Sequence, residues 1–328
     1  MTRVPADHAF TLLRDVYGLP DADIRKLDPA ALAEKIQRVH KGFSAEHEFA
    51  AIASWLGKCS LISQLDNVLH TSATYRAPDF LVVANHKGQD VPFLVEVKSN
   101  DTDKLVWSAN YLESLQVFAA LVKLPLLVAW KRGRLWVLVD SALMLKRVTA
   151  FHLPFEEAIK NSLMSALFGN VWIRFAEEFR LELTMKMMGE VDFAAELLPE
   201  GTYTFQIEDA AVWGSKGRLT RDQEKQMWWF LATAYSETHF DRTKDVATQQ
   251  FRADSESMFN LSDVLVTQLL WDKGEEESID WVSEIRKGLP KPKLDLHTLL
   301  SRALDVGAVR YVFDQVPQII PEFLGKTD

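Results

Sequence analysis

The sequence predicts an α/β domain followed by a second domain of the α+β class. Two short apolar runs rich in β-branched residues, 80–84 and 91–97, flank a polar segment that contains one glycine. Apolar residues then recur with helical period at positions 112, 115, 118, 119 and 122. Beyond Asp140 the pattern changes, and residues 179–187 alternate strictly between apolar and polar side chains, as in a half-buried strand.

The two apolar runs predict an antiparallel hairpin, because a six-residue polar link is too short for a helical crossover. Asp79 then lies at the start of the first strand, across from the end of the second. Glu96 and Lys98 are two residues apart, so their side chains leave the same face of that strand. Two carboxylates and one lysine therefore converge at one end of a sheet, where burial is costly unless these groups bind something.

A divalent cation fits this predicted arrangement. Mg²⁺ takes oxygen ligands, commonly one or two carboxylates together with water and phosphate oxygens. We expect Asp79 and Glu96 to hold Mg²⁺, for which Mn²⁺ can substitute, with the carbonyl of Val97 as a further ligand. Lys98 would stabilise charge on a scissile phosphate or help to deprotonate the attacking water. Gln116, beside the helical stripe, would orient the water or a phosphate.

Asp79, the Glu96-Val97-Lys98 run and a glutamine on the next helix resemble the PD-(D/E)XK nuclease superfamily. The resemblance covers roughly residues 44–140 and is greatest to the Holliday-junction resolvase and Mrr-type restriction branch. It implies a restriction-endonuclease-like core, in which a mixed central sheet is flanked by helices. The order implied is a helix at 44–57, strands near 60–66, 79–84 and 91–98, a helix at 107–123, and strands at 125–130 and 135–139.

Members of this superfamily often carry a glutamate on the first helix, and Glu46 and Glu48 are the candidates here. Glu48 shares a helical stripe with Ile52 and Trp55, which favours Glu48 without excluding Glu46. The alternative to a catalytic site is an ordinary α/β domain, in which Glu96 and Lys98 form a surface ion pair on an edge strand.

Composition and charge narrow the class of protein. The 328 residues are 48% hydrophobic and 25% charged, as in ordinary globular proteins, and the single cysteine excludes a disulfide framework and a cysteine-based zinc site. No apolar run approaches 18 residues and no signal-peptide pattern begins the chain, so we expect a soluble, cytoplasmic protein with no membrane partner.

The net charge of −9 argues against a general coating of nucleic acid, but the charge is unevenly distributed. Residues 1–150 carry 18 basic and 16 acidic side chains, whereas residues 151–328 carry 19 and 30. A nuclease needs only a local basic groove for phosphates. Lys131, Arg132 and Arg134 are the candidate nucleic-acid-binding residues, although a solvated turn between two strands explains them equally well.

Three regions follow from these patterns: an N-terminal helical segment at 1–43, a nuclease-like domain at 44–145 and an acidic α+β domain at 146–328. In the last region we expect a connector at 141–155, helices at 155–168, 222–236 and 261–271, strands at 179–187 and 203–207, and a hairpin turn at 214–217. Two helical segments are expected within 294–323.

Three functions compete at this stage. The first is a Mg²⁺-dependent DNA endonuclease, with restriction or phage defence as the role suggested by family analogy. The second is a catalytically inactive nuclease-fold module that binds nucleic acid or protein, and an RNA-directed nuclease is a variant of the first. The third is an assembly or regulatory protein whose acidic second half carries the function; under the first hypothesis, that half would sense a partner, form homo-oligomers or limit activity.

Overall fold

The computed structural model describes residues 45–65, 75–190, 203–221, 235–242, 246–253, 255–273, 279–287 and 296–325. The predicted N-terminal segment 1–43 and most of the predicted helix 222–236 lie outside these residues. The described residues group into two compact units. The first unit falls within Met1–Gly169, Asp280–Leu289 and Gln315–Asp328, and the second within Asn170–Ile279 and Pro290–Asp314. The three-part division expected from the sequence stays a prediction.

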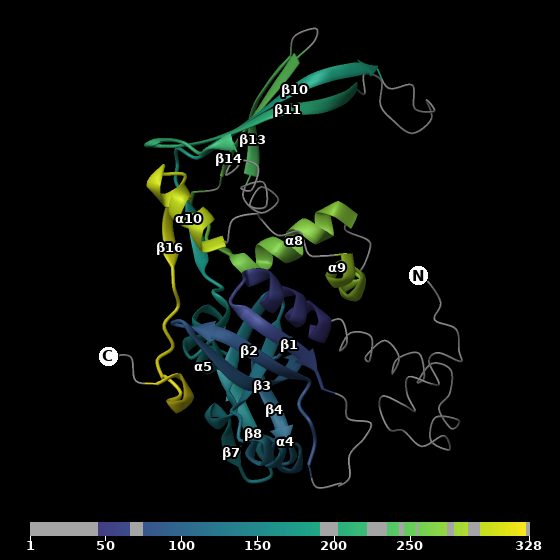
Figure 1. Cartoon of the computed structure of the whole chain (residues 1–328), viewed down its shortest axis with the longest axis vertical. Coiled ribbons are helices and arrows are strands. Elements are labelled where there is room, and N and C mark those ends of the chain that lie inside the picture. Colours follow the sequence, from purple (N-terminus) through teal and green to yellow (C-terminus); the bar gives the residue numbers. More distant parts are fainter. Residues whose placement is uncertain are drawn as a thin grey trace, which may run out of the picture. The chain divides into compact units, whose positions relative to one another are not determined.

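The first unit is built on a mixed sheet with the strand order β1-β2-β3-β5-β6. Figure 1 shows β1, β2 and β3 side by side. Only β3 and β5 are parallel neighbours, and the other neighbouring pairs are antiparallel. Its strands are β1 (Cys59–Gln64), β2 (Phe80–His86), β3 (Gln89–Ser99), β5 (Leu126–Arg132) and β6 (Leu135–Asp140). A helix at residues 45–56 precedes β1. The mixed sheet and the order of these elements agree with the expectation.

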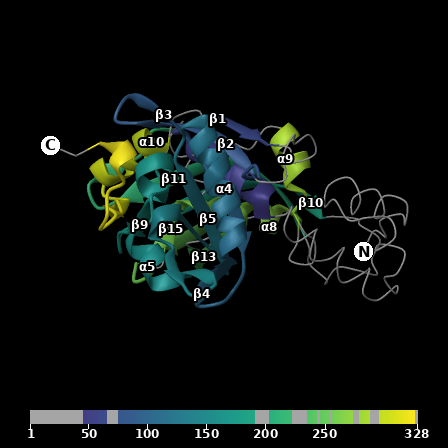
Figure 2. The same cartoon turned by 90° about the horizontal axis from the view of Figure 1, so that it is seen from below.

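Helix α4 (Ala109–Val122) makes the crossover that a parallel pair requires between β3 and β5. Ser108 caps its N-terminus by accepting a hydrogen bond from the amide of Tyr111, and Lys123 ends it in the left-handed conformation. Figure 2 shows α4 in front of the sheet. Leu112, Leu115 and Ala119 on its inner face are buried in a core that they share with residues of β5. The apolar stripe of helical period therefore identifies the buried face of α4.

The hairpin between β2 and β3 is tighter than the sequence predicts. The ladder continues to the pair His86 and Gln89, and only Lys87 and Gly88 form the turn. Both turn residues have positive φ, 52° and 82°, which matches the twist of a two-residue hairpin. The polar residues at 85–90 indicate a loop, but Asn85 pairs with Asp90 and His86 with Gln89 as the last two rungs of the ladder.

The segment expected to be a connector, 141–155, instead forms strands that complete a small sheet in the order β4-β8-β7. Segment 141–155 contributes β7 (Leu145–Arg147) and β8 (Ala150–Pro154) to this sheet, and β4 (Lys104–Ser108) comes from before α4. A short 3₁₀ turn lies at Ser141–Leu143. The helix predicted at 155–168 is divided into α5 (Phe155–Lys160) and a π-helical turn at Met164–Phe168. Helix α9 (Trp281–Lys287) and a 3₁₀ turn at Glu322–Leu324 also belong to this unit.

The second unit contains an antiparallel sheet in the order β12-β11-β10-β14-β13 and a smaller one in the order β15-β9-β16. Its strands are β9 (Trp172–Phe175), β10 (Arg180–Glu190), β11 (Tyr203–Gly214), β12 (Gly217–Arg218), β13 (Tyr235–Arg242), β14 (Val246–Ala253), β15 (Phe259–Asn260) and β16 (Val309–Phe313). Helices α8 (Leu261–Lys273) and α10 (Leu296–Asp305) complete the described part of this unit.

The sequence predicts some elements of the second unit correctly and others wrongly. The predicted strand at 179–187, the turn at 214–217 and the helix at 261–271 are present. The strand predicted at 203–207 runs on to Gly214. The second helical segment expected near the C-terminus is wrong, because β16 pairs with β9 there and its β-branched and aromatic residues suit a strand. Among the described residues, no helix is both long and apolar enough to cross a membrane.

Gly214 is a position where only glycine fits. The chain at the end of β11 runs against the turn after α10, and the amide of Lys216 donates to the carbonyl of Val306 at 2.9 Å. A Cβ atom built on Gly214 would lie 2.3 Å from backbone atoms of Val306, Gly307 and Ala308. Because backbone cannot rotate away as a side chain can, added volume here must move one segment.

Gly214→Ala should therefore lower the free energy of unfolding of the second unit, by about 1–3 kcal/mol, the usual cost of overpacking. Urea unfolding followed by circular dichroism would measure the change. Lys216→Ala, a substitution of an exposed residue in the same hairpin turn, is the control and should change little. Equal midpoints for wild type and Gly214→Ala would contradict this packing.

Candidate active site

Asp79 and the end of β3 meet as the hairpin predicts. Asp79 immediately precedes β2, and Phe80 pairs with Val95 across the ladder. The carboxylate of Asp79 accepts a hydrogen bond from the amide of Val97, with a distance of 2.7 Å between Oδ2 and N. This contact ties the first carboxylate to the strand that carries Glu96 and Lys98.

Glu96 is a carboxylate buried in the middle of the sheet. It is 1% exposed and lies on β3, which has β2 on one side and β5 on the other. Its Oε1 accepts hydrogen bonds from Lys98 Nζ, at 2.5 Å, and from the hydroxyl of Tyr111. Its Oε2 is buried and has no hydrogen-bond partner among the described residues. A surface ion pair on an edge strand is thereby excluded.

Lys98 carries its charge against aromatic rings. Its Nζ lies 5.1 Å from the ring centre of Tyr111 and 5.6 Å from that of Trp107, and these two rings pack edge to face. Burial acts to lower the pKa of Lys98, but attraction to the Glu96 carboxylate outweighs it, and the pKa is raised above its usual range. Lys98 therefore remains an ammonium at neutral pH, which favours charge stabilisation over proton abstraction as its role.

The helix carboxylate that lies with these groups is Glu46. Burial is the main cause that raises the pKa of Glu46 to about 7; the charges of Lys98 and Arg76 lower it and that of Glu96 raises it. Glu46 Oε2 also accepts a hydrogen bond from Gln64 of β1 at 3.3 Å. Glu46 is thus electrostatically linked to the residues on β3.

Glu48, which the sequence favours, is engaged elsewhere. Its Oε2 lies 2.6 Å from Lys131 Nζ, and its Oε1 accepts a hydrogen bond from the indole of Trp136 at 2.9 Å. Glu48 is 5% exposed, so these two contacts satisfy a buried carboxylate and anchor the helix to β5 and β6. The catalytic role expected of Glu48 stays a prediction, and Glu46 is the helix carboxylate that is electrostatically coupled to Glu96 and Lys98.

The predicted basic residues near 131–134 are divided among different partners. Lys131 is paired with Glu48, and Arg132 forms an ion pair with Asp103 and lies over the ring of Phe155. Arg134 is exposed beside the Gly133 turn. Lys131 therefore serves the helix-to-sheet contact, and binding of nucleic acid by these three residues stays a prediction.

On α4, the residue that contacts the carboxylates is Tyr111 and not Gln116. Gln116 is half-buried, whereas the Tyr111 hydroxyl donates to Glu96 and its ring lies beneath both Lys98 and Arg76. The sequence contains a signal for Tyr111, because it lies one helical turn before the buried Leu115. A tyrosine on a buried stripe usually has a hydrogen-bond partner for its hydroxyl. The role of Gln116 stays a prediction.

The three carboxylates repel one another in the absence of a neutralising charge. Burial is the main cause that raises the pKa of Asp79 to about 8, the negative charges of Glu96 and Glu46 add to it, and Lys98 and the amide of Val97 oppose it. An additional positive charge at this point would relieve the repulsion.

The donor set fits a hard divalent cation. Asp79 and Glu96 supply carboxylate oxygens, and the unpartnered Oε2 of Glu96 is a buried acceptor that a cation would satisfy. Among the described residues, however, no group of three His, Cys, Asp or Glu side chains has the geometry of a complete metal site. Two carboxylates with water and phosphate oxygens are a usual Mg²⁺ environment, so the residues fit the ion without enclosing it. The Val97 carbonyl stays a predicted ligand.

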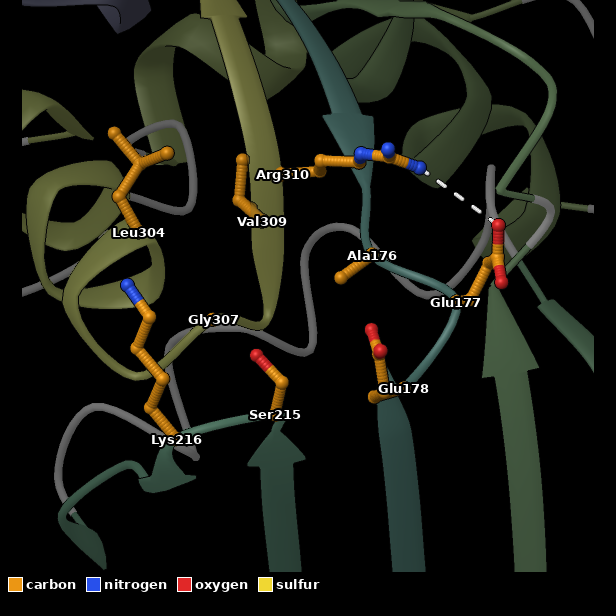
Figure 3. A pocket seen from close by; sticks show the side chains of 9 residues that line it. All are labelled: Ala176, Glu177, Glu178, Ser215, Lys216, Leu304, Gly307, Val309 and Arg310. Carbon is orange, nitrogen blue, oxygen red and sulfur yellow. Dashed lines mark ion pairs between the residues drawn. The ribbon is translucent and has the colours of Figure 1, made fainter.

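A pocket of about 510 Å³ lies in the second unit (Figure 3). Side chains of both charges line it, and Figure 3 shows Arg310 directed toward Glu177, with 3.7 Å between their charged atoms. Lys216 and Glu178 lie on other parts of its wall. Its opposing charges point to no single chemistry, in contrast to the site on β3.

Comparisons with known proteins give little further information. No protein-family model matches the chain, and neither does any curated protein. Part of the structure is similar to the 1.6 Å structure of Archaeoglobus fulgidus Hjc, a Holliday junction resolvase from an archaeal hyperthermophile. The two are 19% identical, with 35% of this chain and 85% of that chain covered and a TM-score of 0.29. A likeness of this extent carries no argument about function.

The raised pKa values of Asp79 and Glu46 predict how stability depends on pH in metal-free buffer. Both folded carboxyls keep protons at pH values where the unfolded chain has lost them. Their stabilising effect is complete below about pH 4 and is lost as the pH rises through about 7 and 8, so the unfolding temperature should fall over this range. Thermal unfolding in EDTA at several pH values measures this slope.

Asp79→Asn should make that slope shallower, because the amide does not titrate. The control is Asp90→Asn, a change at an exposed position in the same hairpin, which should leave the slope as in wild type. An unfolding temperature that rises between pH 5 and pH 8 in wild type and in both variants would contradict the electrostatics of this site.

Proposed function

We propose that this chain is a metal-dependent nuclease that hydrolyses phosphodiester bonds, with DNA as its substrate. The observation that carries the proposal is the buried Glu96 carboxylate, whose free Oε2 lies at a site shared with Asp79 and an ammonium group. Carboxylates and a fixed cation in one place match the needs of phosphoryl chemistry, in which charge develops on the phosphate oxygens.

Each residue of the site has a role in this proposal. Asp79 and Glu96 hold the cation, which when bound supplies Lewis-acid charge and lowers the pKa of water. Lys98, whose side chain is 30% exposed, remains charged and contacts the scissile phosphate. Glu46, with its pKa of about 7, is suited to accept a proton near neutral pH.

Tyr111 positions Glu96 in this scheme. Its hydroxyl and Lys98 both engage Oε1, which leaves Oε2 as the oxygen available to a ligand. The ring of Tyr111 also contacts the cations of Lys98 and Arg76. Groups that orient a metal ligand in this way tune both affinity and activity.

The finer parts of the proposal rest on the family resemblance alone. These are Mg²⁺ as the physiological ion, with Mn²⁺ as a substitute, DNA in preference to RNA, and a role in restriction or phage defence. A cytoplasmic location and a protein partner or homo-oligomer formed through the second unit are likewise proposals.

A second candidate function is a nuclease-fold module that binds nucleic acid or protein without cleaving it. The observation in its favour is that Glu96 Oε1 is already neutralised by Lys98 and Tyr111. Charges that are compensated within the chain can persist as a structural cluster. Cleavage of nucleic acid distinguishes the nuclease from the binding module.

Wild-type protein should cleave plasmid or oligonucleotide DNA with Mg²⁺ or Mn²⁺ and not with EDTA. Asp79→Ala and Lys98→Ala should each lower the rate by at least about a hundredfold, because each removes a charge placed to contact the ion or the phosphate. A gel-based cleavage assay on DNA of several topologies, with RNA in parallel, measures this.

Lys104→Ala, at an exposed position on β4, is the matched loss of one lysine and should leave the rate unchanged. Equal rates for wild type and Asp79→Ala, or no cleavage of any substrate with either ion, would reject the nuclease and favour the binding module.

Tyr111→Phe should lower kcat about 10- to 100-fold and raise the Mg²⁺ concentration needed for half-maximal cleavage, because Glu96 loses one of the two donors that orient it. Metal titrations of the cleavage rate, with melting temperatures as a check of folding, measure both effects. Tyr311→Phe, at an exposed site on β16, is the control and should change neither. A lower melting temperature with unchanged metal dependence would reject the positioning role.

A further inference from the structure

The sheet of the second unit carries a row of arginines across neighbouring strands. The cross-strand pairs are Arg218 with Trp213, Trp213 with Arg180, and Arg180 with Arg252. Residues directly opposite in antiparallel strands point to the same face. Three arginines and one tryptophan therefore form a single rung across β12, β11, β10 and β14. Figure 1 labels three of these strands, β10, β11 and β14. We call it the arginine row.

This face is the polar face of the sheet. On β10 the alternate residues Leu181, Leu183 and Met185 are buried in the core. Arg180 leaves the opposite face and is half-buried, and Arg252 on β14 is exposed. With strands about 4.8 Å apart, the three strand spacings from β12 to β14 extend over about 14 Å.

The tryptophan in the row is flanked by guanidinium groups. The central carbon of the Arg180 guanidinium lies 5.4 Å from the centre of the Trp213 ring, and that of Arg218 lies 5.5 Å from it. β11 runs between β10 and β12, so these two arginines approach Trp213 from neighbouring strands on either side. Planar cations and an indole thus alternate along the row.

Only part of the positive charge of the row is balanced locally, because Arg218 forms an ion pair with Asp209. Arg180 and Arg252 stand directly opposite each other, an arrangement that is unfavourable for like charges. Of the nearby acids, Glu182 accepts a hydrogen bond from Gln250, and Asp209 lies 3.7 Å from Arg218. No hydrogen bond or ion pair joins either acid to Arg180 or Arg252 within the described part of the chain.

The row also contains donors without acceptors. Arg180 Nε and Trp213 Nε1 are buried N–H groups with no hydrogen-bond partner among the described residues. Such groups are costly unless an acceptor reaches them. Two donors and an excess of positive charge at the same place indicate a ligand that carries anionic oxygens.

We propose that the arginine row binds the sugar–phosphate backbone of single-stranded nucleic acid. Guanidinium groups engage phosphate oxygens in a fork of two hydrogen bonds and also stack on flat surfaces. Aromatic side chains within a basic surface are the usual means of holding unpaired bases. An acidic peptide offers carboxylates to the arginines but no flat rings for the tryptophan–arginine stack, so nucleic acid is the better match.

This proposal does not depend on the nuclease chemistry of the first unit. Residues 151–328 carry a strong excess of acidic side chains. That excess repels polyanions in general, so nucleic acid is bound only where positive charge is gathered. The arginine row is such a place. It would give the chain a second contact with a nucleic-acid strand, and this contact would need no other basic surface.

Binding of a fluorescein-labelled oligothymidylate in EDTA tests the proposal, because divalent-dependent cleavage is then absent. Fluorescence anisotropy at several salt concentrations gives both affinity and its salt slope. Loss of each phosphate contact lowers the magnitude of the slope by about 0.7 for a single strand. Arg180→Ala/Arg252→Ala should bind at least about tenfold more weakly at low salt, with a slope smaller by about 1.4.

Arg252→Ala alone is the control for misfolding of the double variant, because it removes only an exposed side chain. It should show about half the change in the salt slope. Arg286→Ala, at an exposed position on α9, is the matched loss of one arginine and should bind as wild type does. Cleavage in Mg²⁺ by wild type and Asp79→Ala is scored in a separate assay, so that a failure of the nuclease proposal is distinguishable from a failure of this one.

Three results would overturn the proposal. The first is absence of oligothymidylate binding by wild type at low salt. The second is binding by Arg252→Ala and by the double variant with the same salt slope as wild type. The third is that labelled poly-glutamate binds through the same arginines while the oligothymidylate does not, which would assign the row to an acidic protein partner.

Discussion

The burial of Glu96 is the constraint on which the first unit depends. A carboxylate that is 1% exposed at the centre of a sheet costs several kcal/mol unless charge and hydrogen bonds compensate it. Lys98 from the same strand and Tyr111 from α4 provide this compensation, and both act on one oxygen. The chain therefore holds a buried charge whose second oxygen is left without a partner. Such an arrangement is hard to explain by stability, because an apolar residue would fill a central strand at lower cost, and this is why a ligand-binding role is the better explanation.

The sequence predicts the first unit well where a feature depends on local pattern. Alternation and turn residues identify the β2–β3 hairpin, and because Glu96 and Lys98 are two residues apart they share a face whatever else the chain does. The choice between Glu46 and Glu48 is different, since it depends on how the helix is rotated against the sheet. That rotation is set by Lys131 and Trp136, more than 80 residues away, which together engage Glu48. The sequence pattern can point to Tyr111, because it is a polar residue on a buried helical stripe. Its hydrogen-bond partner, Glu96, is set by tertiary packing and cannot be predicted in this way.

In the second unit the sequence predicts faces but not neighbours. The alternation at 179–187 correctly separates the buried Leu181 and Leu183 from the polar face that carries Arg180. The arginine row, by contrast, exists only through the register of four strands, in which Arg180 lies opposite both Trp213 and Arg252. A shift of one residue in either pairing would send one of these side chains to the other face. Register of this kind is specified by the whole sheet, so neither the row nor β16 in the smaller sheet could be read from short segments.

The two units place cations on aromatic rings in similar ways, with opposite chemical consequences. Around Tyr111, Lys98 pairs with Glu96, and the charges of Lys98 and Arg76 act on Glu46. Asp79, Glu96 and Glu46 repel one another there, so this group of acids can attract a further cation. Around Trp213, two guanidiniums and the neighbouring Arg252 face few acids, so the group attracts an anion. The net charge of −9 describes neither site, because electrostatic interactions are screened over about 8–10 Å and each site responds to its own neighbours. Phosphate is a group that can meet either requirement, because its oxygens accept hydrogen bonds from guanidiniums and can also share a cation with carboxylates.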